Sequence, residues 1–488
     1  MRPRLQQQQR KWFMPLMVVT VIMSAIITLA IAPSGQVNSV AVSYYDLLAD
    51  AFVHGQLHLR IKPAPELLAL SDPYDPETNW RYRLHDALLY QDQYYLYWGP
   101  APALLLMPVK ALFGMARIAD AYLVLLFTMG IVIGGWLIIR QLHELAAPQA
   151  PQWITALGVL VMAASPPLHY ILARPAVYEA AILGGQCFLL FAFYCVIRSW
   201  HSGGKRNLWA ALAGVCAAFA VGSRFTLLPA AFFLGLMFFW SPWNGMVAVW
   251  RRWSGSGLFF GVPLAVGIVL LGWYNFARFG SWTEIGVRYQ LSSDHIPRIH
   301  DRLSSVAFIP ANLYNYILRP PTFLASEPFV VVRWGKYQFP KFIPVAPNPL
   351  TVHEPMVGIL AVAPWVLFAA APLLELMYYR CLASFHTRQV VDGRTAWLTV
   401  CVSGMSILCF APLQLFAGVT IRYLADFAPM TYILAVMGAW RVDLMLHSHP
   451  SLLVAQRVIM ALLALYTIVV GLLLGLTGYY HPLSHPPV

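Results

Sequence analysis

Runs of about twenty apolar residues recur along this 488-residue chain, and a helix of that length crosses the hydrocarbon core of a bilayer. Hydrophobic residues make up 59% of the chain and charged residues 11%, and the mean hydropathy is +0.63. Such a composition is typical of helical membrane proteins. We therefore predict an all-α polytopic membrane protein, formed as one integral membrane domain over residues 1–488.

The apolar runs predict the spans and their number. Residues 208–240 are interrupted by Gly222-Ser223-Arg224, which predicts two short spans or a re-entrant hairpin turning at Arg224. Counted as two, this run brings the prediction to about eleven transmembrane helices. The other expected spans are 13–32, 118–139, 152–171, 178–197, 255–277, 357–379, 396–415, 424–440 and 453–478.

Basic residues predict the orientation of these spans. Fourteen Lys and Arg residues fall on one side, against three in the short turns of the other side. Because basic loops stay in the cytoplasm, the N-terminus is predicted to be cytoplasmic, with 33–117, 278–356 and the C-terminal HPLSHPPV on the outer side. The first span lacks a small-x-small cleavage site and is expected to be a retained anchor. These basic residues are scattered in small groups, which excludes a nucleic-acid partner.

The first outer loop, 33–117, gathers acidic residues. Eight of the twenty acids lie between Asp46 and Asp92. Residues 44–59 have a helical pattern that stops at Gly55, and Asp46, Asp50 and His54 recur on one face of it. The simplest structure is an amphipathic helix in the outer interface with its carboxylates toward water.

Two further segments of this loop have local explanations. The segment Asp72–Asn79 contains two Asp-Pro pairs, which predict successive turns, although its oxygens could also hold a hard cation such as Ca²⁺. The tyrosines and Trp98 of 90–114 suit the boundary between water and lipid, and Gly99-Pro100-Ala101-Pro102 breaks the chain where it returns to the membrane.

The second outer loop, 278–356, is rich in proline and aromatic residues. It is too long for a structureless connector, so we expect it to fold over the first loop or to be functional, with short interfacial helices. We expect acceptor binding here.

Three short outer turns hold one arginine each. Arginine at membrane depth is costly and usually has a partner. One explanation is a structural ion pair, for example with Glu179 or Asp426, and the other is a phosphate clamp. The three residues are Arg174, Arg224 and Arg422.

Taken together, these features resemble the GT-C superfamily of polytopic glycosyltransferases. The segment YYDLLADAFVHGQL is similar to the Tyr-x(3)-Ala-x(5 or 6)-Gly helix of bacterial aminoarabinose and protein O-mannosyl transferases. The segments YYLYWGPAPALLLMPVKALFG, YNFARFGSW and IRYLADFAP also resemble family elements. The chain departs from the family at Ala41 and Val42, where an Asp-Glu pair is usual, and at Gly99–Pro102, which lacks the family lysine.

The resemblance implies sugar transfer, with inversion, from a polyprenyl-phosphate donor to an acceptor hydroxyl on a glycan, lipid or protein. It also implies the inner membrane of a bacterium. Such a reaction needs a carboxylate base and cations for the departing phosphate. Asp46 is the leading base, with Asp50 and Asp86 as the other candidates. No metal ligands or cofactor are assigned, and a divalent cation is left open. The expected substrate-binding residues are Arg174, Arg224, Arg422, Tyr45 and Tyr95.

Two other classes of protein stay open. A transporter or flippase for lipid-linked sugars is favoured by Gly222-Ser223-Arg224, although most charges lie in the outer loops and not at the midplane. A polysaccharide polymerase or ligase would place Arg and His in a large outer loop, as His295, Arg298 and His300 are here.

Overall fold

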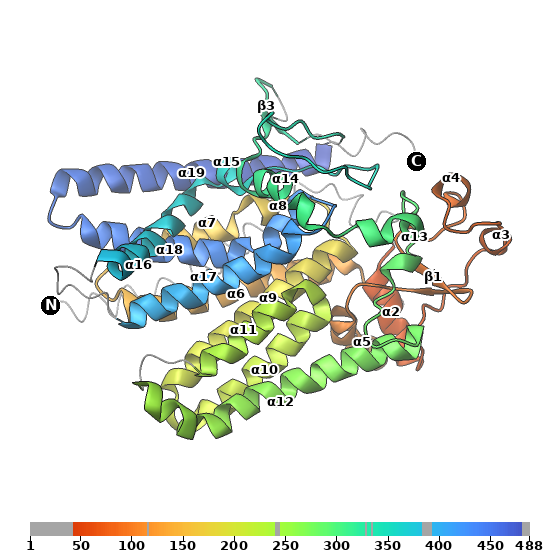
Figure 1. Cartoon of the computed structure of the whole chain (residues 1–488), viewed down its shortest axis with the longest axis horizontal. Helices are drawn as coiled ribbons and strands as arrows, with labels where there is room; N and C mark the ends of the chain where they lie inside the picture. Colours follow the sequence, from red (N-terminus) through yellow and green to blue (C-terminus); the bar gives the residue numbers. More distant parts are fainter. Residues whose placement is uncertain are drawn as a thin grey trace.

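A computed structural model describes residues 42–114, 117–239, 245–326, 329–332, 335–382 and 393–480. The predicted first span at 13–32 and the C-terminal tail lie outside these residues. The described chain is mostly helical, and its long helices run roughly side by side (Figure 1). The bundle helices are α6 (Asp120–Ala146), α7 (Gln152–Ala163), α8 (Pro166–Ala173), α9 (Val177–His201), α10 (Arg206–Ser223), α11 (Leu228–Phe239), α12 (Gly245–Phe279), α15 (Ile359–Val362), α16 (Ala370–Leu382), α17 (Gly393–Gln414), α18 (Ala428–Met445) and α19 (Pro450–Tyr480).

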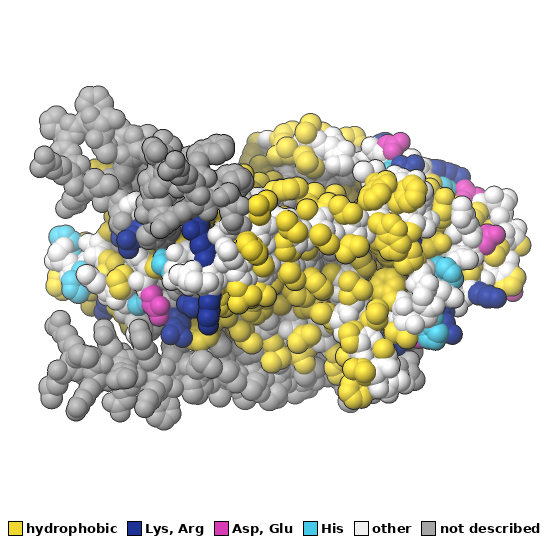
Figure 2. Space-filling model, turned by 90° about the horizontal axis from the view of Figure 1, so that it is seen from below, with side chains coloured by type: hydrophobic (Ala, Val, Ile, Leu, Met, Phe, Trp, Pro, Cys, Tyr) yellow, Lys and Arg dark blue, Asp and Glu magenta, His cyan; other side chains and the backbone are white. Residues whose placement is uncertain are grey.

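Seven helices in the described residues are long and apolar enough to cross a membrane, with α7 and α8 taken as one unit. The protein is therefore a multi-pass membrane protein. The exact number of crossings, predicted as about eleven, stays a prediction. An apolar belt separates two ends that carry charged side chains, as Figure 2 shows for one face. This belt matches the surface that a bilayer would cover.

Prolines break two of the spans that the sequence predicted as single helices. Pro166 and Pro167 begin α8 after a break from α7, and Pro364 begins a 3₁₀ segment, Pro364–Ala369, between α15 and α16. Proline lacks the N–H that a continuous helix needs, so each span is built from shorter pieces.

The run 208–240 turns at Arg224, as predicted. α10 ends at Ser223, a 3₁₀ segment covers Phe225–Leu227, and α11 follows. α11 has 12 residues and rises about 18 Å, which is short of the hydrocarbon thickness. Residues of the break, among them Arg224 and Phe225, line a cavity, which is where irregular backbone is tolerated in a membrane protein.

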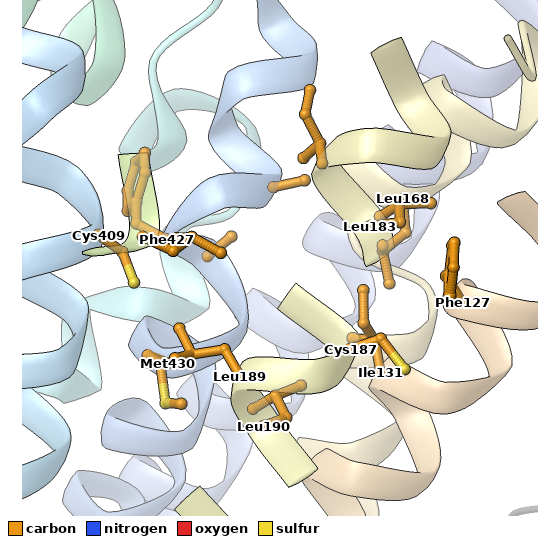
Figure 3. Close-up of a cluster of buried hydrophobic side chains, with 14 of the residues drawn as sticks. Phe127, Ile131, Leu168, Leu183, Cys187, Leu189, Leu190, Cys409, Phe427 and Met430 are labelled. Atoms are coloured by element: carbon orange, nitrogen blue, oxygen red, sulfur yellow. The ribbon is translucent and has the colours of Figure 1, made fainter. Parts of the chain in front are cut away.

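The core lies where α6, α8, α9, α17 and α18 meet. Large apolar side chains from these helices interdigitate there (Figure 3), and Phe127, Leu183 and Met430 are almost completely buried. Lipid tails are as apolar as these side chains, so close packing rather than escape from water holds the helices together. This rigid centre fixes the helix ends from which the outer site is built.

The outer elements gather at one end of the bundle, opposite the turn between α18 and α19 (Figure 1). Besides short 3₁₀ turns and a π-helical turn (Tyr314–Leu318), they are α2 (Tyr44–Val53), α3 (Pro65–Leu68), α4 (Pro76–Asn79), β1 (Leu88–Tyr90), β2 (Gln93–Tyr95), α5 (Ala101–Phe113), α13 (Ile296–Ile299), α14 (Ile309–Leu313), β3 (Thr322–Phe323) and β4 (Val330–Val331). β1 pairs antiparallel with β2, and β3 with β4. Which end faces the cytoplasm stays a prediction from the basic residues.

The second outer loop folds over the first, as expected. The Asp86 N–H donates to the Leu291 carbonyl (2.7 Å), and the Leu291 N–H donates to the Ala87 carbonyl (2.9 Å). A bridge between Leu88 and Gln290 continues this pairing. Backbone hydrogen bonds thus join two segments about 200 residues apart, and side chains from both loops face one site.

Local turn chemistry shapes the first loop. The Asp75 carboxylate accepts the Glu77 N–H and caps α4, and the Asp72 carboxylate accepts the Tyr74 N–H. These are the turns that the Asp-Pro pairs predicted. The described residues contain no group of three or more His, Cys, Asp or Glu side chains placed to share a metal ion.

Candidate functional site

A cavity of about 420 Å³ lies at the outer end of the bundle, below the second outer loop. Its wall is formed by the segment before α5, the outer ends of α9, α10 and α12, the second loop, and the 3₁₀ segment Ile421–Asp426. Apolar side chains make up much of the wall. Its charged and hydrogen-bonding side chains include Tyr97, Tyr178, Arg224, Asn275, Arg278, Gln290, Tyr337, His353, Glu354, Thr420, Arg422 and Tyr423.

One corner of the cavity depends on a close approach between two backbones. Gly99 precedes α5 and lies against Gly222 near the end of α10. A Cβ atom on Gly99 would lie 2.0 Å from the Gly222 carbonyl oxygen, which no side chain could tolerate. Because both glycines adjoin residues of the wall, this contact sets the distance between Trp98 and Arg224.

Arg224 forms a forked ion pair with a buried carboxylate. Its Nε donates to one oxygen of Asp426 (2.8 Å) and its NH2 to the other (2.6 Å). The guanidinium also lies 4.9 Å from the centre of the Tyr423 ring. This is the structural pair that the sequence offered as one explanation for Arg224, and it ties the α10–α11 break to the segment before α18.

Arg422 forms the second ion-paired group. Its NH2 donates to Glu354 Oε1 (2.6 Å), its NH1 lies 3.8 Å from Glu179 Oε1, and the guanidinium stacks 4.4 Å from the Tyr178 ring centre. Its buried Nε has no hydrogen-bond partner within the described residues, and neither does the hydroxyl of Thr420. Polar atoms left unpaired at a cavity wall are suited to a ligand.

Arg278 differs from both because no carboxylate pairs with it in the described part of the chain. It is 6% exposed, and its donors reach the carbonyls of Tyr274 and Leu96 and the amide oxygen of Asn275. Its guanidinium lies 3.7 Å from the centre of the Tyr274 ring. These acceptors are neutral, so they stabilise the guanidinium without compensating its positive charge, and the cavity wall is positively charged at this point.

Asp86 is held beside the cavity by the second loop. Its backbone has a left-handed φ of 65°, an uncommon conformation that Asp tolerates better than most residues. Gln290, a cavity residue, donates through Nε2 to Asp86 Oδ1 (2.8 Å). Burial raises the pKa of Tyr97 well above its usual range, and the nearby Asp86 carboxylate raises it further. Tyr97 is therefore a protonated hydrogen-bond donor at the wall.

Asp46 does not lie where the sequence suggested. The expectation that this helix turns its carboxylates toward water is wrong for Asp46, which is 5% exposed. Its Oδ1 accepts from Lys110 Nζ (2.6 Å) and from the Ile118 N–H (2.9 Å). The lysine of α5 draws this carboxylate inward, because a buried ammonium needs an opposite charge.

The remaining predicted residues also lie away from the cavity wall. Asp50 pairs with Arg60 (3.0 Å) at the surface, and Arg174 is exposed beyond α8. Tyr45 is completely buried, and Tyr95 packs against Phe279. Of the predicted site residues, the cavity wall contains Arg224 and Arg422.

Several wall residues were not predicted from the sequence. Arg278 was not predicted because it lies in the last turn of the long helix α12 and not in a short outer turn. Its position after Asn275, in the last turn of an apolar span, is a signal that could have identified it. Gln290 and Glu354 carry no such signal, since each lies in a polar loop.

The fold and the cavity define a multi-pass helical membrane protein with an arginine-lined cavity at one end of its helix bundle. No protein-family model matches the chain, and no curated protein sequence matches it. Among solved structures, it is similar to the crystal structure of ArnT from Cupriavidus metallidurans bound to undecaprenyl phosphate. The TM-score is 0.43 and the identity 10%, and the match covers 96% of this chain and 76% of that chain. This is a likeness of general arrangement.

Proposed function

We propose that this protein is a membrane glycosyltransferase that moves a sugar from a polyprenyl-phosphate donor to an acceptor hydroxyl at the outer face of the membrane. The observation that carries the proposal is Arg278, a buried guanidinium that lines the cavity without a carboxylate partner among the described residues. A buried cation of this kind favours an anionic ligand. A phosphate is suited to the planar donors of a guanidinium.

The apolar part of the wall suits a lipid-linked donor. Val221 of α10 and Leu271 of α12 line the same cavity as Arg278. α12 leaves Val266, Val269 and Leu270 exposed on its outer surface, which a bilayer would cover. A donor with an isoprenoid tail can therefore keep the tail in lipid and place its phosphate beside Arg278.

Asp86 is our proposed base among the three candidates, because Asp46 is paired with Lys110 and Asp50 lies at the surface with Arg60. In the proposed step, the acceptor oxygen attacks the anomeric carbon as its proton passes to the Asp86 carboxylate. The bond from the anomeric carbon to the phosphate oxygen breaks with inversion. The electron pair of that bond leaves with the lipid phosphate, whose charge Arg278 stabilises.

The second outer loop is the proposed acceptor side, as expected from the sequence. Val287, Ile296 and Leu303 contribute its part of the cavity wall. We place the protein in a bacterial inner membrane with this site facing the periplasm, on the strength of the basic-residue asymmetry.

Purified protein in lipid nanodiscs, given a panel of polyprenyl-phosphate sugars, tests the proposal by release of lipid phosphate. Arg278→Gln should weaken donor binding about ten- to hundred-fold, because a hydrogen bond to a charged group contributes about 1.5–3 kcal/mol. The matched control is Arg319→Gln, since Arg319 also stacks on aromatic rings and donates to neutral oxygens but does not line the cavity. Its donor KM should be that of the wild type.

Other results would favour the other classes of protein. If no donor releases lipid phosphate, the glycosyltransferase proposal is wrong. Movement of an intact lipid-linked sugar across a vesicle membrane would favour a flippase, and growth of a glycan chain on a lipid diphosphate would favour a polymerase.

A further inference from the structure

Gln290 connects the proposed base to the wall of the cavity. It is 8% exposed and comes from the second outer loop, 204 residues from Asp86. Its Nε2 donates to Asp86 Oδ1 (2.8 Å) and lies 3.4 Å from the hydroxyl of Tyr178. Tyr178 in turn forms a side-chain hydrogen bond with Tyr97. Asp86, Gln290, Tyr178 and Tyr97 thus form a continuous network of polar side chains.

The backbone around Gln290 holds this side chain in place. The next residue, Leu291, exchanges hydrogen bonds with Asp86 and Ala87 across the two loops. The pairing fixes both the left-handed backbone of Asp86 and the position of the amide that faces its carboxylate. Strained backbone of this kind persists when surrounding contacts determine it, and it is common at functional sites.

We propose that Gln290 is a positioning residue that acts through Asp86: its amide fixes the orientation of the carboxylate that accepts the acceptor proton. This inference rests on the proposed function. The amide N–H donates to one oxygen of the carboxylate and so restricts its rotation. Gln290 touches no reacting atom in this scheme.

Other groups also act on Asp86 and must be held constant in any test. One is His85, whose Nε2 lies 3.7 Å from Asp86 Oδ2. Four further side chains interact electrostatically with Asp86. They are the guanidinium of Arg83 and the phenols of Tyr44 on α2, Tyr97 before α5 and Tyr178 at the start of α9.

The test measures kcat and donor KM for transfer in nanodiscs for Gln290→Met, which keeps length and volume but removes the donor. We expect kcat to fall about tenfold, because the carboxylate is then no longer held in the orientation that accepts the proton. Donor KM should change little. Gln290→Glu places a second carboxylate beside Asp86 and should lower kcat further, because the like charge repels the Asp86 carboxylate from its position.

His295→Gln is the matched control for a purely structural contact. His295 also joins the two outer loops, through Asp72 (2.9 Å), but does not touch Asp86. It should leave kcat close to that of the wild type. The double variant Asp86→Asn/Gln290→Met should be no slower than Asp86→Asn alone, since residues that act as a unit are not additive.

Two results would overturn the inference on its own, provided that wild type and Asp86→Asn behave as proposed. One is an unchanged kcat in Gln290→Met, and the other is independent losses of rate in the double variant. Absence of transfer by the wild type would overturn the proposed function together with this inference, so the two failures are distinguishable.

Discussion

The pairing of Asp46 with Lys110 leads to a prediction that separates a structural carboxylate from a catalytic one. The two side chains are 7% and 6% exposed, and Lys110 Nζ lies 2.6 Å from Asp46 Oδ1. Asp46→Asn keeps the size of the side chain but removes the charge that faces the buried ammonium. We therefore expect this substitution to destabilise the fold rather than to act on the reaction alone.

The size of the effect follows from burial. Removing one partner of a buried ion pair costs about 3–5 kcal/mol, because the other charge stays buried without compensation. That cost is a factor of roughly a hundred to a few thousand in the folding equilibrium. Asp50→Asn is the matched control, since its pair with Arg60 is 31% and 47% exposed and such pairs contribute about 0–1 kcal/mol.

Unfolding of the solubilised protein in SDS, followed by circular dichroism, measures the difference. Asp46→Asn should unfold at clearly lower SDS than Asp50→Asn. Asp46→Leu/Lys110→Met should recover most of the loss, because apolar residues of similar volume often replace a buried pair without cost. If Asp46→Asn unfolds like wild type yet has lost transfer, the structural reasoning is wrong and Asp46 is the base, as first expected from the sequence.

Gly99→Ala should slow transfer about 10²-fold, because the added Cβ forces the start of α5 away from the Gly222 carbonyl. Gly222→Ala meets only the Ala101 side chain, at 3.3 Å, and should slow transfer far less; equal rates in a transfer assay would contradict this. Arg224→Lys and Arg422→Lys keep the charge but lose the paired donors, so turnover should fall several-fold. Full turnover with an unchanged donor KM would assign that arginine a structural role only. Lys205→Cys should resist an impermeant thiol reagent in intact cells, and its labelling would reverse the predicted orientation.

The sequence by itself determined most of the membrane architecture. Spans are encoded in windows of about twenty apolar residues, and the break at Arg224 follows from the local Gly-Ser-Arg interruption. The first-loop helix was predicted from its periodicity and ends at Val53, just before Gly55, whose φ is +70°. Each of these features depends on residues that are neighbours in the chain, so local propensity was enough.

The arginines were predicted in part. The sequence suggested ion pairs with Glu179 or Asp426 as one role for the isolated arginines, and the structure contains both contacts. The sequence could not distinguish Arg224 and Arg422, which have carboxylate partners, from Arg278, which has none among the described residues. That distinction depends on which carboxylate lies within about 4 Å of each guanidinium, and the paired residues lie far apart in the sequence.

Only the tertiary structure decided which of the predicted carboxylates lies beside the cavity. Asp46 was favoured because it starts the first outer helix, but Lys110, 64 residues later, holds it in a buried pair. Asp86 is held beside the cavity by Gln290, 204 residues away, because the second loop folds over the first. Helical periodicity places side chains on a face, but the partner that packs against that face is set by the assembly of the whole bundle, where charge pairing and burial are resolved together.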